Sequence, residues 1–378
     1  MYVVTHAVTA RSFLRGQLAF MGRQGFDVSV VAGGDHGELA AAAMREGVRS
    51  LSVPMEREMS PRADLVSLSA MTRALWALEP DIVNASTPKG GLLGMMAARA
   101  LRIRSRVYLL RGLRLETERG ARRAILATTE RIASMCATEV VCVSRSLSEV
   151  AVSGGFVSER KARVLGDGAS NGVDAERFSL RDDVVARAKA LRDELGIPHD
   201  APVVGFIGRL VADKGIDELA RAMEIVREHV PKARLLLVGA DFAGDDVDPA
   251  AQRLKTHSGS VVVGSVEDPA PYYALMDILA FPSKREGFPN VPIEAAACER
   301  PVVGFRATGV VDAVASGVTG ELVATNDVDA LAGALVRYLR DPALRRAHGR
   351  AGRARVLASF TNERVWTAWA EHYRALVA

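Results

Sequence analysis

Two glutamates stand eight positions apart in the segment 283–303, which reads SKREGFPNVPIEAAACERPVV, and both could do chemistry at a binding site. A glycine, two prolines and Asn290 separate Glu286 from Glu294. This pattern predicts a loop followed by a helix with Asn290 as its N-cap. Glu294 then falls one position too late for a reciprocal capping box, so its carboxylate is available to a ligand. The helix end itself favours an anion.

A second group of residues supplies positive charge. The stretch 205–219, GFIGRLVADKGIDEL, carries Arg209 and Lys214 in a loop between a predicted strand and a predicted helix. Gly208 allows a close approach of the backbone, and the spacing lets both cations converge on one anion. Cations and carboxylates at the ends of such strands suit a ligand that carries both phosphates and hydroxyls.

The secondary structure that positions these residues is indicated by short apolar runs that alternate with helical patterns. This alternation continues along the whole chain of 378 residues and predicts α/β doubly wound parallel sheets. The rhythm breaks at 165–183, which is rich in Gly, Asp and Asn. We therefore predict one Rossmann-like domain over 1–168, a second over 169–360, and a C-terminal helix over 361–378 that packs back on the first. Paired domains of this kind leave a cleft at the carboxyl ends of their strands.

Basic residues gather in one part of the chain. The net charge is only +4, from 49 basic and 45 acidic residues, but arginines crowd the stretch 99–123. Such a cluster suits a phosphorylated substrate or the inner face of a membrane, and a solvated helix face is an equal alternative. Nucleic acid is not expected, because Tyr108 is the cluster's only aromatic residue. The chain shows neither a signal peptide nor a long apolar run, so we expect a cytoplasmic protein.

Several cofactor motifs are missing from the sequence. There is no Walker-type loop, and GDGASNG at 166–172 has the wrong glycine spacing for a dinucleotide fingerprint. The Asp-Val-Asp triplet at 246–248 resembles a metal-binding motif of some sugar-nucleotide enzymes but lies in a polar turn. We therefore expect neither a cofactor nor a metal ion.

Several motifs together resemble those of a known family. GRLVADKG, LLLVG, YYALMDILAFPS, EGFPNVPIEAAACERPVV and GVTGELV are similar to the donor-binding half of retaining glycosyltransferases of family 4. TPKGGLLGMMAARAL and GDGASNGVDAERF resemble the subgroup that builds capsule and lipid-linked oligosaccharides. The resemblance implies the GT-B fold, in which two Rossmann-like domains face each other across a cleft. The first would bind the acceptor, and the second a nucleotide-sugar donor.

The same resemblance implies roles for individual residues. Arg209 and Lys214 would hold the diphosphate and stabilise its charge as it leaves. Glu294 would accept hydrogen bonds from the ribose, and Glu286 would bind hydroxyls of the donor sugar. Catalysis is thus assigned to Arg209, Lys214 and Glu286, and donor binding to Gly16, Arg111, Gly208, Val266, Glu286, Gly287, Phe288, Pro289, Asn290, Val291 and Glu294.

Three of these residues carry specific expectations. Val266 would bind the base through its backbone, and Gly16 would face the diphosphate unless it is a packing glycine. Arg111 stands where many members of the family carry a histidine beside the reacting sugar. Because an arginine stays protonated near neutral pH, it would bind the donor sugar or a phosphate of the acceptor rather than act as a base. His6 could replace the histidine, although a structural role is favoured.

The sequence thus predicts a metal-independent retaining glycosyltransferase, with a UDP-sugar as the favoured donor. The acceptor would be a hydroxyl on a lipid-linked saccharide or a natural product, and the region 99–123 could touch the inner membrane face. A sugar-nucleotide epimerase or a phosphorylase with the same architecture is the main alternative. A retaining glycosidase that uses Glu286 and Glu294 is a weaker one, because it would not need the two cations.

Overall fold

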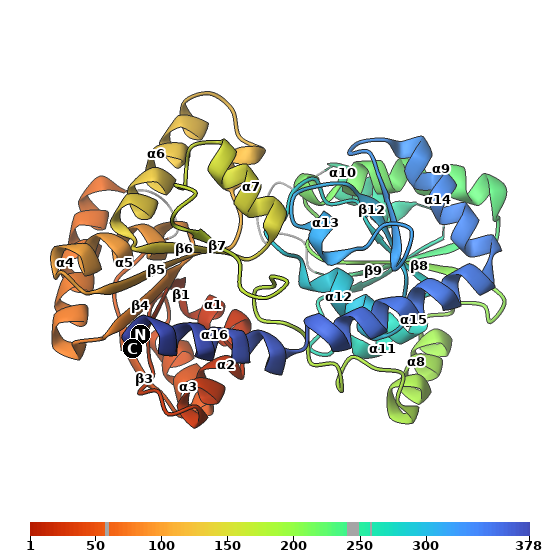
Figure 1. The fold of residues 1–378 in the computed structure, drawn as a ribbon. Helices are drawn as coiled ribbons and strands as arrows, with labels where there is room; N and C mark the ends of the chain where they lie inside the picture. The colour runs from red at the N-terminus through yellow and green to blue at the C-terminus, as the bar shows by residue number, and fades with distance from the viewer. Residues whose placement is uncertain (57–59, 240–248, 258) are drawn as a thin grey trace. The chain divides into compact units, whose positions relative to one another are not determined.

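The computed structural model describes residues 1–56, 60–239, 249–257 and 259–378. The chain divides into two compact units (Figure 1). The first unit comprises Met1–Gly172 and Asn362–Ala378, and the second comprises Val173–Thr361. From the sequence we had placed the two boundaries at 168/169 and 360/361.

The first unit is built on a seven-stranded sheet with the order β3-β2-β1-β4-β5-β6-β7, in which all neighbours are parallel. Its strands are β1 (Tyr2–His6), β2 (Ser29–Gly33), β3 (Arg49–Ser52), β4 (Ile82–Ser86), β5 (Ser105–Leu110), β6 (Glu139–Cys142) and β7 (Ala162–Arg163). Its helices are α1 (Ala7–Phe13), α2 (Gln17–Arg23), α3 (His36–Glu46), α4 (Pro61–Leu78), α5 (Pro88–Ala100), η1 (Arg114–Glu116), α6 (Gly120–Cys136), α7 (Arg145–Ser153) and α16 (Asn362–Val377). Helices α4 to α6 cover one face of the sheet, and α1 to α3 with α16 lie on the other (Figure 1).

The second unit has a six-stranded parallel sheet with the order β10-β9-β8-β11-β12-β13. Its strands are β8 (Val203–Ile207), β9 (Arg234–Val238), β10 (Ser260–Gly264), β11 (Ile278–Phe281), β12 (Val302–Phe305) and β13 (Gly320–Val323). Its helices are α8 (Asp182–Glu194), η2 (Ala212–Lys214), α9 (Ile216–His229), α10 (Pro249–Thr256), α11 (Ala270–Leu275), α12 (Asn290–Ala297), α13 (Val310–Ala313), α14 (Val328–Arg340) and α15 (Pro342–Ser359). Helices α9, α10 and α14 pack on one face of this sheet (Figure 1).

Both sheets have the doubly wound topology that the βα alternation predicted. Their central strands are apolar and almost wholly buried, as is usual when helices cover both faces of a parallel sheet. The strand order reverses between β1 and β4 in the first unit and between β8 and β11 in the second. Loops that leave the carboxyl ends of such paired strands are where ligands of these sheets bind.

Helix α16 belongs to the first unit although it ends the chain. Its apolar face buries Trp366, Trp369 and Tyr373. The Tyr373 hydroxyl accepts a hydrogen bond from the Asn84 side chain at 2.5 Å. Large aromatic rings of this kind bury much apolar area and pack the helix against the first unit. Within the part of the chain that the structure describes, none of the helices has the length and apolar character that crossing a bilayer requires.

Candidate functional site

Two loops meet at the point where the strand order of the second sheet reverses. Residues 208–215 follow β8, and residues 282–289 follow the neighbouring strand β11. Gly215 lies in the left-handed region, with φ at 70°, and a Cβ there would stand 2.0 Å from the Pro282 carbonyl oxygen. The Lys284 backbone N–H donates to the Asp213 carbonyl at 3.0 Å. The glycine and the hydrogen bond therefore hold the two loops in direct contact.

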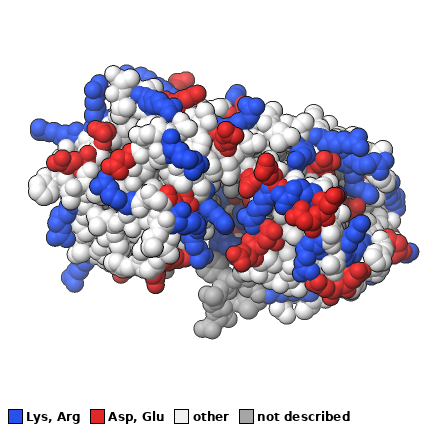
Figure 2. All heavy atoms as spheres, turned by 90° about the horizontal axis from the view of Figure 1, so that it is seen from below, with Lys and Arg blue, Asp and Glu red and all other residues white. Residues whose placement is uncertain are grey.

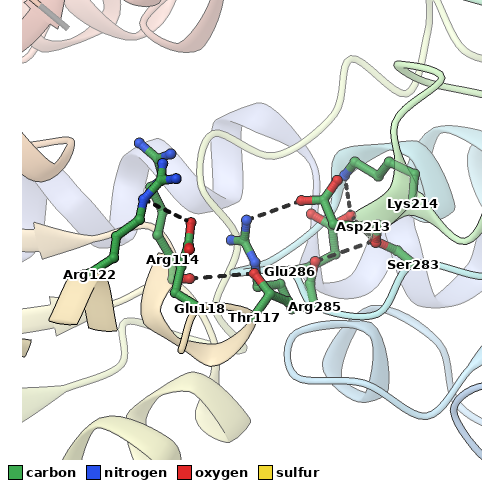
Figure 3. A network of polar contacts seen from close by, with 9 residues as sticks. All are labelled: Arg114, Thr117, Glu118, Arg122, Asp213, Lys214, Ser283, Arg285 and Glu286. Atoms are coloured by element: carbon green, nitrogen blue, oxygen red, sulfur yellow. Dashed lines mark hydrogen bonds and ion pairs between the residues drawn. The ribbon is translucent and has the colours of Figure 1, made fainter. Parts of the chain in front are cut away.

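Lys214 and Glu286, predicted to share a ligand, are brought together by this contact (Figure 3). The ammonium of Lys214 forms an ion pair with Oε1 of Glu286. The Ser283 hydroxyl donates to the same oxygen at 2.7 Å. The side chains of Lys214 and Glu286 are only 19% and 15% exposed, so this pair is largely shielded from water. Glu286 is thus held in one orientation before any ligand arrives.

The charges on the two neighbouring residues are paired in the same way. Each of residues 284, 285 and 286 forms an ion pair with a residue of the segment 213–218. The pairs are Lys284 with Glu218 at 2.7 Å, Arg285 with Asp213 at 3.0 Å, and Glu286 with Lys214. Because three consecutive residues of one segment are paired with residues of the other, the ion pairs hold the two segments side by side.

Arg209 lies on the first of the two loops, directly after Gly208, and is exposed. The backbone of Gly208 is in close contact with that of a second glycine, Gly239. A Cβ on Gly239 would stand 1.9 Å from the Gly208 carbonyl oxygen, whereas a Cβ on Gly208 would have 3.7 Å of clearance. Gly208 itself has φ at 151°, which a side chain rarely adopts. Its glycine is therefore required by backbone conformation rather than by crowding.

The predicted N-cap of α12 is wrong by one residue. Pro289 takes the N-cap position with extended φ and ψ, and Asn290 is the first helical residue. An Asn290 cap would have lacked one of its two usual donors, because the residue two positions on is Pro292. The Asn290 side-chain oxygen is instead buried and has no hydrogen-bond partner among the described residues. The first N–H groups of any α-helix likewise lack intrahelical partners.

Glu294 consequently lies in the second turn of α12, not in the first. It accepts a hydrogen bond of 2.7 Å from the hydroxyl of Tyr273, a fully buried residue of α11. Burial raises the pKa of Glu294, and the hydrogen bond from Tyr273 and the charge of Arg177 oppose that rise. The protein therefore already holds one oxygen of the Glu294 carboxyl group.

The loop between Glu286 and Glu294 packs against neighbouring segments of the second unit. A Cβ on Gly309 would stand 2.3 Å from the Gly287 carbonyl oxygen, so the two backbones touch. Phe288 is buried, with its ring 5.2 Å from that of Phe360. Val291 is the second residue of α12 and is partly buried. Val266 lies farther along the sheet, in the loop after β10, and is partly buried.

Gly16 in the first unit has a structural explanation. It caps α2 with φ at 78°, and a Cβ there would stand 2.7 Å from the Trp366 ring. Its backbone N–H donates to both carboxylate oxygens of Glu46 at 2.9 Å. That N–H is therefore occupied by the protein, which favours the packing role over the contact with a diphosphate.

Arg111 follows β5, next to the strand where the order of the first sheet reverses. One guanidinium nitrogen donates to the Ser170 hydroxyl at 2.6 Å, and the group lies 5.4 Å from the centre of the Phe13 ring. Burial lowers the pKa of Arg111 to about 10, so the group remains charged at neutral pH. His6 accepts from the Val8 N–H at 3.3 Å and caps α1, as a structural histidine would.

Sequence reasoning missed Ser283 and Tyr273, the residues that hold the two glutamates. Ser283 is 1% exposed and stands three positions before Glu286 in the segment 283–303, but neither its type nor its spacing indicates the contact. Tyr273 stands 21 positions before Glu294, and no spacing rule connects them. Among the described residues, no group of three or more metal-ligating side chains lies together. The triplet 246–248 lies outside the described residues.

Comparisons with known proteins agree on one family. Residues 9–168 match the model of a glycosyl transferase 4-like domain, and residues 201–341 match that of glycosyl transferases group 1. The chain is 35% identical to the capsular polysaccharide biosynthesis glycosyltransferase CapM of Staphylococcus aureus over 96% of its own length and 94% of that protein. It is 26% identical to an Escherichia coli UDP-Gal:alpha-D-GlcNAc-diphosphoundecaprenol alpha-1,3-galactosyltransferase over 79% and 77% of the two chains.

Solved structures show the same fold. HepE of Anabaena, in complex with UDP, superposes with a TM-score of 0.77 at 21% identity and covers 95% of this chain and 96% of its own. Sucrose-phosphate synthase of Thermosynechococcus elongatus reaches 0.79 at 22% identity, with coverage of 97% and 92%. The predicted GT-B fold, with two Rossmann-like units, is thereby confirmed.

Proposed function

The chain belongs to the group 1 glycosyltransferases, which have the GT-B fold, and we propose that it is a retaining enzyme that transfers a sugar from a nucleotide diphosphate donor to an acceptor hydroxyl without a metal ion. UDP is the favoured nucleotide. One observation carries this proposal: Lys214 and Glu286, from loops after two adjacent strands, form a largely buried pair where the second sheet reverses its order. A cation for a diphosphate thus stands beside a carboxylate for sugar hydroxyls.

Each of the site residues of the second unit has a separate role in the proposed transfer. Lys214 and Arg209 stabilise the negative charge that develops on the leaving diphosphate. Glu286, held by Ser283, accepts hydrogen bonds from the donor sugar. Glu294 accepts hydrogen bonds from the ribose. The acceptor attacks from the side of the leaving group, and a phosphate oxygen takes its proton, so the configuration of the sugar is retained.

The names of similar proteins support the choice of donor and acceptor. HepE was solved with UDP, and the E. coli relative is named as a UDP-galactose enzyme acting on a lipid diphosphate. A relative from Mycolicibacterium smegmatis, 35% identical over 48% of this chain and 49% of its own length, is named as GDP-mannose-dependent. The capsular relative points to cell-envelope polysaccharide. We therefore propose a saccharide on a lipid diphosphate as the acceptor, with a natural product as the alternative.

A lipid-linked acceptor would place the enzyme in the cytoplasm, against the inner face of the membrane. In the first unit, the exposed arginines of 99–123 are Arg99, Arg102, Arg104, Arg114, Arg119, Arg122 and Arg123. On the face seen in Figure 2, however, basic side chains lie among acidic ones. Helix α4 carries exposed apolar side chains of its own, since Leu65, Val66 and Trp76 are 69%, 59% and 70% exposed. Exposed apolar residues with arginines are typical of a membrane-surface contact.

Vesicle binding tests the membrane contact. Trp366 and Trp369 are buried, so a change in tryptophan emission on adding vesicles would report on Trp76. We expect a blue shift with vesicles rich in phosphatidylglycerol, a smaller one with phosphatidylcholine, and loss of binding at high salt. Equal emission with and without anionic vesicles would exclude this surface.

Thermal unfolding with nucleoside diphosphates is the first test of the donor site. A ligand that binds only the folded state stabilises it by about 2.7 kcal/mol at a hundred times its Kd. We expect UDP to raise the melting temperature more than GDP, ADP or TDP, with no change on adding EDTA. Absence of any shift would remove the roles given to Lys214 and Glu294. Turnover then separates the alternatives, because an epimerase converts the donor without an acceptor and a phosphorylase consumes inorganic phosphate.

A further inference from the structure

The guanidinium of Arg111 is buried with only part of its hydrogen-bonding capacity used. One nitrogen donates to Ser170, while Nε and Nη2 are inaccessible to water and have no acceptor among the described residues. Buried N–H groups normally find a partner, and leaving one without an acceptor costs about 1–3 kcal/mol, or more when it is charged. Two such groups on one arginine indicate that a binding partner is missing.

Within the part of the chain that the structure describes, no carboxylate forms an ion pair with Arg111. The groups that favour its charged form are the phenols of Tyr2 and Tyr373, not a carboxylate. Burial raises the pKa of both phenols, so they are neutral near pH 7. The pKa of Arg111 falls only to about 10, so the arginine itself is charged. A buried, unpaired cation is unfavourable unless an anion arrives to pair with it.

The loop that carries Ser170 is held in a strained conformation. Ala169 has φ at 88°, which is unusual for a residue with a side chain, and its N–H donates to the Val143 carbonyl at 2.8 Å. Asn171 accepts from the Trp366 indole at 2.6 Å and so fixes the other side of Ser170. Strain of this kind costs about 1–3 kcal/mol and is found where a binding site must be preorganised.

From these observations we propose that Arg111 and Ser170 form an anion subsite in the first unit that binds a phosphoryl group of the acceptor. The assignment to the acceptor rests on the proposed function, in which the donor diphosphate is held by Arg209 and Lys214 of the second unit. The ring of Phe13, 45% exposed beside the guanidinium, offers an apolar surface to the sugar attached to that phosphate. The acceptor would therefore be recognised by its phosphate and not only by its sugar.

Calorimetric titration with inorganic pyrophosphate in saturating UDP tests this subsite, because UDP keeps the donor site occupied. We compare the wild type with Arg111→Met, Arg111→Lys and Ser170→Ala. Arg160→Met is the matched control, since Arg160 is an exposed arginine of the same unit. We expect pyrophosphate to bind about 10- to 100-fold more weakly to Arg111→Met, with partial recovery in Arg111→Lys and an unchanged affinity in the control. The UDP affinity of each variant is measured in parallel, so that a contribution of Arg111 to donor binding is seen separately.

The stability of the unliganded protein distinguishes binding from a structural role. Because Arg111→Met removes an unpaired buried charge, its melting temperature should equal or exceed that of the wild type. Equal pyrophosphate affinities, no pyrophosphate binding to the wild type, or a lowered melting temperature with unchanged affinity would overturn the subsite. Loss of UDP binding in Arg111→Met would assign the arginine to the donor instead. If UDP fails to bind the wild type, the proposed function fails, and the titration without UDP still tests Arg111.

Discussion

Removing one hydroxyl group tests whether Glu294 binds the donor as a carboxylate. Burial raises the pKa of Glu294, and the hydrogen bond from Tyr273 counteracts that rise. Tyr273→Phe removes only the hydroxyl that donates this hydrogen bond and leaves the packed ring of α11 in place. The pKa of Glu294 should then rise further, so that less of it is ionised at a given pH. A ribose that needs the carboxylate would be bound less well.

The size of the effect follows from the kind of hydrogen bond. A hydrogen bond to a charged group contributes about 1.5–3 kcal/mol, and one between neutral groups about 1 kcal/mol. The ionised form of Glu294 therefore loses about 0.5–2 kcal/mol more than the protonated form when the hydroxyl is deleted. Donor affinity exists above the pKa of Glu294 and is lost as the pH falls through it. The variant should match the wild type at about pH 8 and fall to about 2- to 30-fold weaker UDP binding as the pH decreases.

Calorimetric titration of UDP between about pH 5 and pH 8 measures this profile. Tyr272→Phe is the matched control, because Tyr272 is the preceding residue of the same helix and is partly exposed. Its profile should follow that of the wild type. Identical profiles for Tyr273→Phe and the wild type would refute the role of the hydrogen bond. A loss of the same size at every pH would show that Tyr273 supports the fold and not the charge.

Other substitutions should separate turnover, donor binding and stability. Lys214→Ala should lower kcat about 100-fold, while Glu294→Ala should mainly raise the KM for the donor, about 10-fold, in steady-state assays. Glu130, whose pKa burial raises to about 7 from 4.5, binds protons more tightly in the folded state. The stability it contributes is therefore full below about pH 4.5 and is lost as the pH rises through 7, by up to about 3 kcal/mol, and urea unfolding should show a flatter profile for Glu130→Gln. Gly16→Ala should cost at least about 1–2 kcal/mol in the same assay, since an alanine there must adopt a left-handed φ and displace Trp366.

The sequence predicts which loops carry the site because sheet topology leaves little choice. Lys214 and Glu286 follow two apolar strands, and the doubly wound order makes those strands neighbours. The carboxyl ends of parallel strands lie at one edge, so the two loops had to meet there. Nothing in the spacing shows that Ser283 would bind the same oxygen of Glu286 as Lys214 does. Such a contact depends on rotamers, which the sequence does not reveal.

Capping and glycine roles were harder to predict for local reasons. Asn290 is a good capping residue by type, yet Pro292 removes one of the N–H groups that it would have capped, and the helix begins with Asn290 inside it. Gly16 looked equally suited to a ligand contact and to packing. Its N–H proved to be bound by Glu46, 30 positions away. A glycine reports a conformational need, and the group that it approaches is fixed only by tertiary structure.

Lys214 and Arg111 differ in whether a carboxylate pairs with them, and this difference predicts different responses to anions. Lys214 is paired with Glu286 before a ligand binds, so an incoming diphosphate must share the lysine with that carboxylate. The net electrostatic gain there is reduced, and selectivity can come from the sugar that satisfies Glu286. Arg111 has no such carboxylate partner among the residues that the structure describes, so an anion beside it removes an existing penalty as well as adding an attraction. The same anion should therefore bind more tightly at Arg111 than at Lys214, and at one anion concentration it should stabilise the folded first unit more than the second.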